Sequence, residues 1–280
     1  IHFEGEVDVR ATNRRITSDL LVVTLSRRID FTAEVSRDTG DLLRRVDFTG
    51  HVRVENRTYK ESQLVSVDRL HLGFLSMDHR TGKILGTGPG EVSTIRTGQS
   101  GSMLWARSPG QLPGREPDAN GLFLINVAFQ KAMQGNFHQR QIHFEDEVVT
   151  VYGPVDHWEQ KLDPDFPQQL GPRGFVLNCN RLSFFDMRRE NSKTSGYELF
   201  ATGNSTVEGE TFFARSQSIT YATAKEQLIL EGGSRSAAVL WYRQHASSAA
   251  NRIPARKIIY WPRIKKYEVL DVGTPTLQSF

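Results

Sequence analysis

The 280-residue sequence lacks the features that would identify a metalloprotein, a disulfide scaffold or a membrane-spanning helix. Cys179 is its single cysteine, which excludes an internal disulfide and a cysteine-based zinc site. No run of eighteen apolar residues occurs, which excludes a transmembrane helix. The eight histidines never form a His-x-His or His-x-x-x-His pair, so we predict neither a local metal site nor a cofactor.

Catalytic motifs are also missing. Residues 98–102 (GQSGS) approach the Gly-x-Ser-x-Gly motif of serine hydrolases, but the last position is serine and no helix follows. Carboxylates such as Glu4, Glu6, Asp8 and those of residues 145–147 could face each other across a groove, as in glycosidases. Carboxylates at alternate positions of a strand more often form its solvated face. We therefore predict no catalytic residues, and an enzyme acting on polysaccharide is the third hypothesis.

Charge of one sign is not in excess, because 35 Lys and Arg residues stand against 32 Asp and Glu residues. The net charge of +3 argues against a dedicated nucleic-acid surface. One basic and aromatic stretch, residues 257–267 (KIIYWPRIKKY), leaves three interpretations open. It could stack nucleic-acid bases, lie at the mouth of a lipid groove, or form an edge strand that Lys and Pro protect from aggregation.

Helical periodicity is nearly absent, and alternation of side chains takes its place. Only residues 127–133 (VAFQKAM) follow a 3.6-residue period, and this segment is too short for a stable helix, so we expect a strand or a single turn. Residues 197–231 form short alternating segments separated by glycines, which predicts a β-meander. Three polar insertions, at residues 96–120, 155–173 and 245–254, predict long surface loops.

An internal duplication is indicated by two nearly identical heptapeptides, IHFEGEV at residue 1 and IHFEDEV at residue 142. Similar segments follow each copy. Residues 19–25 correspond to 175–185, 48–54 to 201–207, 70–73 to 228–231, and 90–95 to 235–240. We predict two halves, residues 1–141 and 142–280, which could be separate units or one continuous stacked domain.

The order of parts in residues 197–231 resembles a known repeat. It consists of a Gly-x-x-x-Val strand, a tight turn, a strand ending in an aromatic residue, a polar link and Leu-x-Leu-x-Gly. This order is similar to the OstA-like repeat of lipopolysaccharide-transport proteins, the periplasmic LptA family and its relatives, and the likeness is clearest from about residue 196 to 273. The resemblance implies an all-β fold, a twisted and stacked β-jelly roll that forms an open sandwich and holds lipid acyl chains.

The resemblance also implies a function. We expect a non-enzymatic carrier or bridge for a lipopolysaccharide-type glycolipid in the periplasm of a double-membraned bacterium, with other envelope transport proteins as partners through exposed edge strands. The alternating apolar positions that we expect to line the lipid slot are Leu21, Val23, Leu25, Leu70, Leu72, Phe184, Phe213, Ile219, Tyr221, Leu228, Leu230 and Trp241.

The main alternative is a structural or adhesive β-module of the envelope, with a closed core and its function on the loops. The substitution Leu228→Asp separates the two cases. In a splayed slot the new carboxylate is hydrated when the slot is empty, so the fold survives. In a closed core it becomes a buried, unpaired charge and unfolds the domain.

Overall fold

The computed structural model of the chain describes residues 1–27, 42–97, 121–171, 174–186, 197–222, 227–243, 248–261 and 266–270. In these ranges seventeen strands form one antiparallel sheet, and no α-helix occurs. The predicted all-β fold of jelly-roll type is therefore confirmed. The strands of the first half are β1 (His2–Ala11), β2 (Arg14–Leu25), β3 (Leu43–Lys60), β4 (Gln63–Asp78), β5 (Lys83–Thr87), β6 (Gly90–Thr97), β7 (Leu122–Phe129) and β8 (Ala132–Asn136). Those that follow are β9 (Gln141–Val155), β10 (Phe175–Asp186), β11 (Tyr197–Gly209), β12 (Phe212–Ala222), β13 (Gln227–Glu231), β14 (Ala238–Tyr242), β15 (Asn251–Ala255), β16 (Lys257–Trp261) and β17 (Lys266–Leu270), and one 3₁₀ turn, η1 (Pro167–Leu170), follows β9.

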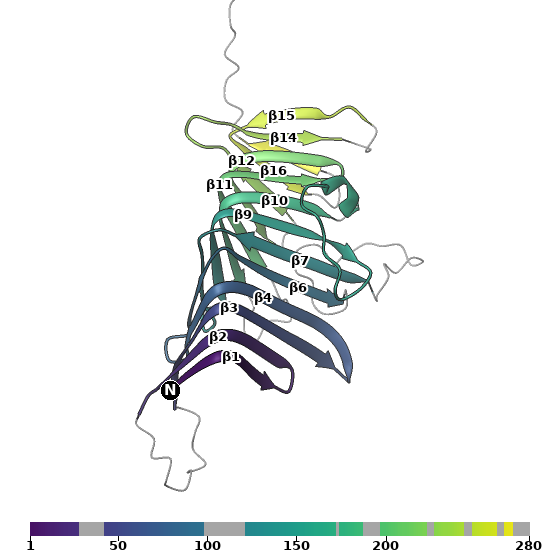
Figure 1. The fold of residues 1–280 in the computed structure, drawn as a ribbon. Helices are drawn as coiled ribbons and strands as arrows, with labels where there is room; N and C mark the ends of the chain where they lie inside the picture. Colours follow the sequence, from purple (N-terminus) through teal and green to yellow (C-terminus); the bar gives the residue numbers. More distant parts are fainter. Residues whose placement is uncertain are drawn as a thin grey trace, which may run out of the picture.

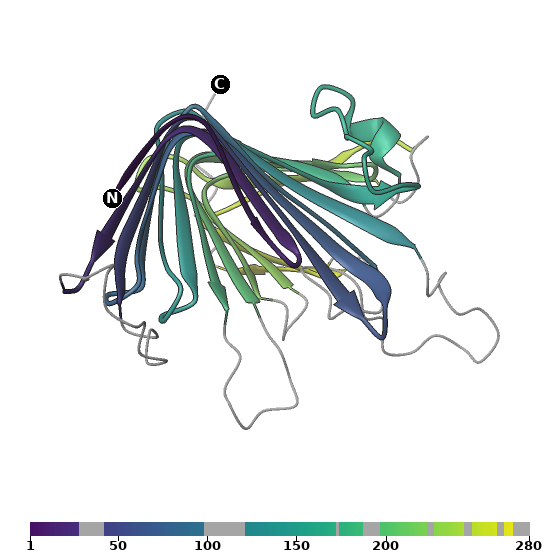
Figure 2. The ribbon, with the colours of Figure 1, turned by 60° about the horizontal axis from the view of Figure 1, so that its bottom comes forward.

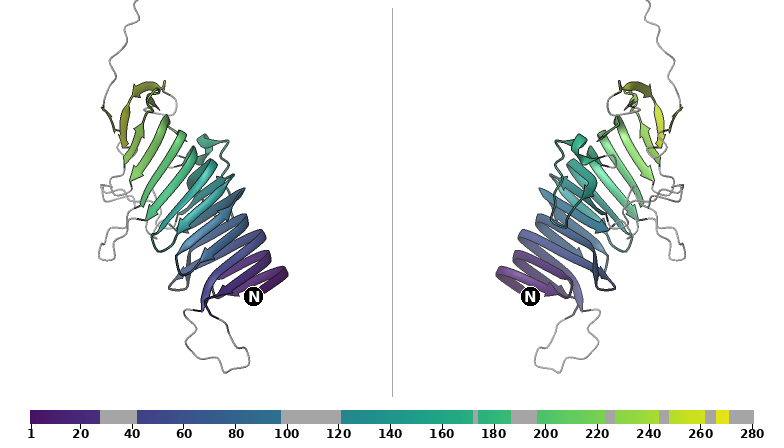
Figure 3. Two further views of the ribbon diagram at one scale, coloured as in Figure 1. Left: turned by 90° about the vertical axis from the view of Figure 1, so that its left-hand side faces the viewer. Right: turned by 90° about the vertical axis from the view of Figure 1, so that its right-hand side faces the viewer.

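The sheet is bent along one line into two arms, so that a view along the stack shows an inverted V (Figure 2). The long strands β1–β4 and β9–β12 cross this corner and contribute half of their length to each arm. Arm 1 also contains β5, β8, β13, β16 and β17, and arm 2 contains β6, β7, β14 and β15. The strands lie side by side in an elongated stack that begins at β1 and ends at the last strands of the chain (Figures 1 and 3).

The corner is made by register shifts and left-handed backbone at the middle of the long strands. In β3 the pairing with β4 shifts between Thr49 and Val52, where Gly50 and His51 have φ values of 76° and 45°. In β11 the shift lies between Thr202 and Ser205, where Gly203 and Asn204 have φ values of 82° and 51°. A bulge adds a residue to one strand and bends it, and glycine adopts the left-handed conformation without a steric cost.

The strand pairing repeats itself along the chain. β1 to β8 pair with one another in the same pattern as β9 to β16: each half has a meander of four long strands, and its fourth long strand pairs with one short strand in each arm. β9 pairs with β7, β8 and β10, so the sheet is continuous through the predicted boundary at residue 141. The topology is thus duplicated within one sheet.

The structure corrects one detail of the predicted alignment of the two halves and one detail of the predicted loops. By its pairing β4 corresponds to β12, and β5 to β13, so the alignment of residues 70–73 with 228–231 is wrong. Within the insertion at residues 245–254, the last four residues belong to β15.

The insertion at residues 155–173 is more than a surface loop. Its described part places Trp158, Leu162 and Leu170 on the outer face of arm 2. Arg69 Nη1 donates a hydrogen bond to the carbonyl oxygen of Trp158 at 2.9 Å and anchors this cover.

The main core lies between the inner faces of the two arms. Near the corner Phe129 of arm 2 packs on Phe144 of arm 1, with ring centroids 5.4 Å apart. Cys179 is buried in the same core, and burial raises the pKa of its thiol to about 12. The thiol is therefore protonated at neutral pH and acts as a small apolar filler, as expected from its position in the sequence.

The corner predicts a specific effect of adding a side chain at Gly50. A Cβ atom there would clash with the carboxylate of Asp19, and the left-handed conformation costs a non-glycine residue about 1–2 kcal/mol. We expect Gly50→Ala to lower the free energy of unfolding by at least this amount in urea denaturation. Gly73→Ala in β4 is the matched control, because a Cβ atom there would lie 4.0 Å from its nearest neighbour. Equal stability of the two variants would contradict this account of the corner.

Candidate lipid-binding groove

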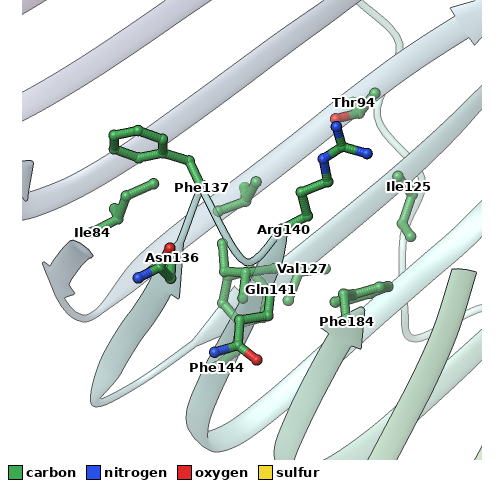
Figure 4. Close-up of a pocket in the computed structure, with 12 residues that line it drawn as sticks. Ile84, Thr94, Ile125, Val127, Asn136, Phe137, Arg140, Gln141, Phe144 and Phe184 are labelled. Carbon is green, nitrogen blue, oxygen red and sulfur yellow. The ribbon is translucent and has the colours of Figure 1, made fainter. Parts of the chain in front are cut away.

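A cavity of about 260 Å³ lies between the two arms in the middle of the stack. Its walls come from both arms: Ile84, Ile142, Phe144 and Phe184 from arm 1, and Val92, Thr94, Ile125 and Val127 from arm 2 (Figure 4). Val127 and Phe144 are buried, whereas most of the other wall residues are only half-buried. The space between the arms is therefore apolar and not filled by the protein's own side chains.

The inner face of arm 2 becomes more polar from the corner toward the opening of the V. On β4 the inward positions run from Leu72 through Leu70 to Asp68 and Ser66, because side chains alternate along a strand. Asp68 accepts hydrogen bonds from Asn56 Nδ2 at 3.2 Å, Ser66 Oγ at 3.2 Å and Thr94 Oγ1 at 3.0 Å.

The neighbouring strand β6 follows the same gradient, from Val92 through Thr94 to Arg96. A guanidinium nitrogen of Arg96 lies 3.6 Å from Asp68 Oδ1. Arg96 Nε is buried and has no hydrogen-bond partner in the part of the chain that the structure describes. The opening of arm 2 therefore carries a buried N–H donor beside the cavity wall.

Arm 1 shows the same gradient. On β9 the inward positions run from Phe144 at the corner to Ile142, and the turn before this strand carries Arg140 at the opening. Figure 4 shows the Arg140 side chain reaching toward Thr94 of arm 2. Asn136 and Gln141 lie at the same rim. The groove is thus apolar at the corner and polar at the opening on both sides, with an arginine on each arm.

The C-terminal end of the stack is built differently, because its inner faces stay apolar as far as the tips of the arms. Tyr260 of β16 in arm 1 contacts Phe212 and Tyr242 of arm 2, with ring centroids 5.4 Å and 6.2 Å apart. Leu228, Leu230, Leu240 and Ile258 beneath these rings are at most 4% exposed. The arms are closed on each other here, and the groove ends.

The twelve residues predicted to line the slot fall into three groups. Leu21, Val23, Leu25, Leu70, Leu72 and Phe184 face the space between the arms, and Phe184 lines the cavity. Ile219, Tyr221, Leu228 and Leu230 also face inward but lie in the closed C-terminal core. Phe213 and Trp241 lie on the opposite, outer face of arm 2.

The placement of Phe213 and Trp241 corrects the expected inner stripe that ended at Trp241. Phe213 and Trp241 are partners across β12 and β14, and their neighbours Ala214 and Leu240 are the buried, inward residues. The described residues of the basic and aromatic stretch at 257–267 have different surroundings. Residues 262–265 of this stretch lie outside the described ranges. Tyr260 lies in the core, while Lys257 Nζ pairs with Glu231 Oε1 at 2.8 Å and Lys266 lies over the ring of Trp261.

Most of the cavity wall was not predicted from the sequence, although it left a signal there. Ile125 and Val127 belong to the alternating segment LFLINVAF of β7. Ile142 and Phe144 belong to the second copy of the duplicated heptapeptide, where Arg140 comes directly before the strand. The leucines of the closed core follow a more regular alternation than these residues.

The structure describes several of the carboxylates and potential metal ligands that the sequence offers for catalysis or metal binding. Among the described residues no group of three potential metal ligands occurs. Asp8 is bound by Arg10 and Arg15, whose hydrogen bonds lower the pKa of its carboxyl group to about 2. Glu145 lies 3.8 Å from cationic nitrogens of both Lys131 and Arg181. Residues 98–102 lie outside the described ranges.

Comparison of the sequence with models of known protein families and with curated proteins found no match. No helix among the described residues has the length and hydropathy needed to cross a membrane.

The closed C-terminal end determines the expected effect of Leu228→Asp. Because Leu228 is 4% exposed, the new carboxylate would be buried and unpaired, so we expect a loss of about 3–5 kcal/mol of stability. Ile229→Asp is the matched control, since Ile229 is the next residue and faces outward from arm 1. Thermal melting that shows Leu228→Asp to be no worse than Ile229→Asp would mean that this end of the stack is open.

Proposed function

We propose that the chain is a non-enzymatic protein of the envelope of a double-membraned bacterium, in the periplasm, which holds the acyl chains of a lipopolysaccharide-type glycolipid and bridges its passage between the two membranes. One observation carries this proposal: both arms of the groove change from apolar at the corner to polar at the opening, where each arm has an arginine. That gradient matches an amphiphile whose chains enter first and whose head group stays at the opening. The likeness of residues 197–231 to the OstA-like repeat supports the same ligand class.

The size of the groove favours acyl chains over a compact apolar ligand. The cavity of about 260 Å³ is below the ~300–1,000 Å³ of pockets for whole drug-sized ligands. It accommodates a segment of a chain, and the half-buried residues on both sides of it along the stack extend the apolar track. Each buried CH₂ contributes about 0.8 kcal/mol, so a chain lying along the track gains affinity with its length.

The polar opening suits an anionic head group. Arg140 lines the cavity mouth, and Arg96 lies at the opening of arm 2 beside Asp68. Guanidinium binds phosphate and carboxylate in a bidentate manner. An acceptor atom of the head group would also satisfy Arg96 Nε. Among the described residues that line the cavity none carries a carboxylate, which supports a binding role over glycosidase chemistry.

Partners from the envelope transport machinery would use the ends of the sheet. Among the described strands β1 pairs only with β2, so one side of its backbone is unpaired. Phe3 on this strand is 49% exposed and is paired with the inward Leu21. An added strand would therefore continue both the sheet and the groove. The nearly equal numbers of basic and acidic residues argue against a nucleic-acid partner.

The alternative is a structural or adhesive β-module of the envelope, and the closed C-terminal core is the observation that favours it. There the two arms pack as an ordinary sandwich with no room for a ligand. The two proposals differ in what they expect of the central cavity. A scaffold has no use for it, whereas a carrier requires it.

The central test places a charge in the cavity and the same charge on the opposite face of one strand. Ile84 of β5 lines the cavity, and the adjacent Leu85 is 45% exposed on the outside. We expect Ile84→Asp to weaken binding of a lipid A-type ligand by at least about tenfold, because a carboxylate must be desolvated against the acyl chain. Leu85→Asp should bind like the parent protein.

Binding is measured by fluorescence displacement of a bound fatty-acyl probe, and stability by urea denaturation of the same samples. We expect the Leu85→Asp stability to be within about 0.5 kcal/mol of the parent. Absence of binding by the parent, or equal binding by both variants, would contradict the carrier and favour the scaffold.

A second prediction concerns the head group. We expect Arg140→Ala to weaken binding of the phosphorylated ligand about fivefold, corresponding to ~1 kcal/mol for one cation near an anionic head group, and to leave an uncharged acyl ligand unaffected. Arg53→Ala is the matched control, since Arg53 is exposed on arm 2. Titrations of both ligands at low and high salt separate the binding of head-group charge by Arg140 from a contribution of Arg140 to the shape of the cavity. A parallel loss for both ligands would mean that Arg140 shapes the cavity instead of binding charge.

A further inference from the structure

A second cavity, of about 270 Å³, lies on the outer side of arm 2. Its lining includes Phe213, Trp241, Glu208, Glu210 and Arg243, and Gln168 of η1 at one side. Phe213 and Trp241 face away from the groove, on the opposite side of the sheet from the apolar track. This cavity is therefore separate from the proposed lipid site.

The strand register builds the cavity from one row of outward residues. Across neighbouring strands Val176 is opposite Glu208, Glu208 is opposite Phe213, Phe213 is opposite Trp241, and Trp241 is opposite Arg252. Leu170 of η1 packs over the aliphatic end of this row, on Val176. The turn also contacts β11, and Gln168 borders the cavity on this side. Glu208, Phe213 and Trp241, farther along the row, are half-buried among the described residues.

The two aromatic rings form a platform, with their centroids 5.1 Å apart and their planes at 46°. Both are only half-buried. Glu208 and Glu210 lie at the cavity with Arg243. Within the described ranges none of these three charged side chains makes an ion pair or a hydrogen bond to another side chain. Charged groups beside half-buried rings at one cavity offer a polar ligand both hydrogen bonds and a stacking surface.

The combination of groups selects the chemical class of that ligand. Ring faces attract C–H groups that carry partial positive charge. Carboxylates accept hydrogen bonds and a guanidinium donates them, so a ligand that satisfies both must donate and accept. The two glutamates repel a simple anion. A simple cation would be attracted by the glutamates and the ring faces but would leave Arg243 without an acceptor, so a cation is tested as the competing ligand class. A sugar ring has hydroxyl groups that donate and accept, and a C–H face that stacks on tryptophan.

We propose that this outer cavity binds a saccharide, with a sugar ring stacked on Trp241 and its hydroxyl groups bonded to Glu208, Glu210 and Arg243. The ligand class is a neutral oligosaccharide, either free or as part of a larger glycan. The site faces away from the groove, so it can be occupied whether or not the groove holds lipid.

The test titrates the whole chain with a panel of neutral oligosaccharides that carry no acyl chain, namely maltoheptaose, cellohexaose and chitohexaose, followed by saturation-transfer NMR and calorimetry. Choline is included as the cationic probe. We expect at least one oligosaccharide to bind, and Trp241→Ala to weaken it by at least about tenfold, or ~1.4 kcal/mol. Glu208→Gln should also weaken it, while Trp241→Phe, which keeps a ring, should retain more binding than Trp241→Ala.

Trp261→Ala is the matched control, because Trp261 lies on arm 1 under Lys266, and its binding should equal that of the parent. Ile84→Asp should also bind saccharide normally, which separates this test from that of the lipid groove. The proposal is overturned if no oligosaccharide of the panel binds at about 10 mM, or if binding is the same in Trp241→Ala, Glu208→Gln and the parent. Binding of choline alone would also overturn it, in favour of a cation site.

Discussion

The structure depends on one constraint: each long strand must turn out of one arm and into the other at the same level of the stack. A strand that bent earlier or later would lose its ladder of hydrogen bonds to both neighbours, and its inward residues would face the solvent. The bulges and left-handed residues at Gly50 and Gly203 place this turn in both halves of the chain. Contacts beside them lock neighbouring corners together, as where His51 Nδ1 lies 2.8 Å from Asp19 Oδ2.

Whether the space inside the corner is a core or a groove depends on the side chains near the tips of the arms. At the C-terminal end aromatic rings from the two arms contact each other, Tyr260 against Phe212 and Tyr242, and fill the space between the arms. In the middle of the stack the strand pairing puts Asp68, Thr94 and Gly135 at the positions of Phe212, Tyr242 and Tyr260, and the arms stay apart around a cavity. A repeated fold therefore produces a closed half-sandwich and an open one within a single sheet.

The sequence predicts the strands and the duplication well, because alternation and the repeated heptapeptide are local signals. Phe3 and Phe144, at the same position of the two copies, are both opposite an inward leucine of the next strand. The face of a strand is harder to predict where both faces are apolar. Phe212 and Phe213 are adjacent aromatics, and only the pairing with β14 decides which of them is inward.

The closure of the groove could not be predicted from local pattern at all. Leu228 and Leu230 have the same alternation as the half-buried residues of the cavity. They are buried because β16 pairs beside them, with Tyr260 opposite Leu228, and because β14 of the other arm contacts β13. Arg140 is in an exposed turn, which in the sequence is no different from any other polar turn. Its position at the cavity mouth follows from the fold of β8 and β9.

The proposed function requires that the groove between the arms hold an acylated lipid. Native mass spectrometry of the protein, purified without detergent from cells that produce it, tests this requirement. The account predicts a species heavier than the chain by the mass of an acylated lipid, which fragments on activation to release fatty acyl groups. A spectrum that contains only the unmodified chain, from a preparation in which a known lipid carrier keeps its ligand, would contradict it.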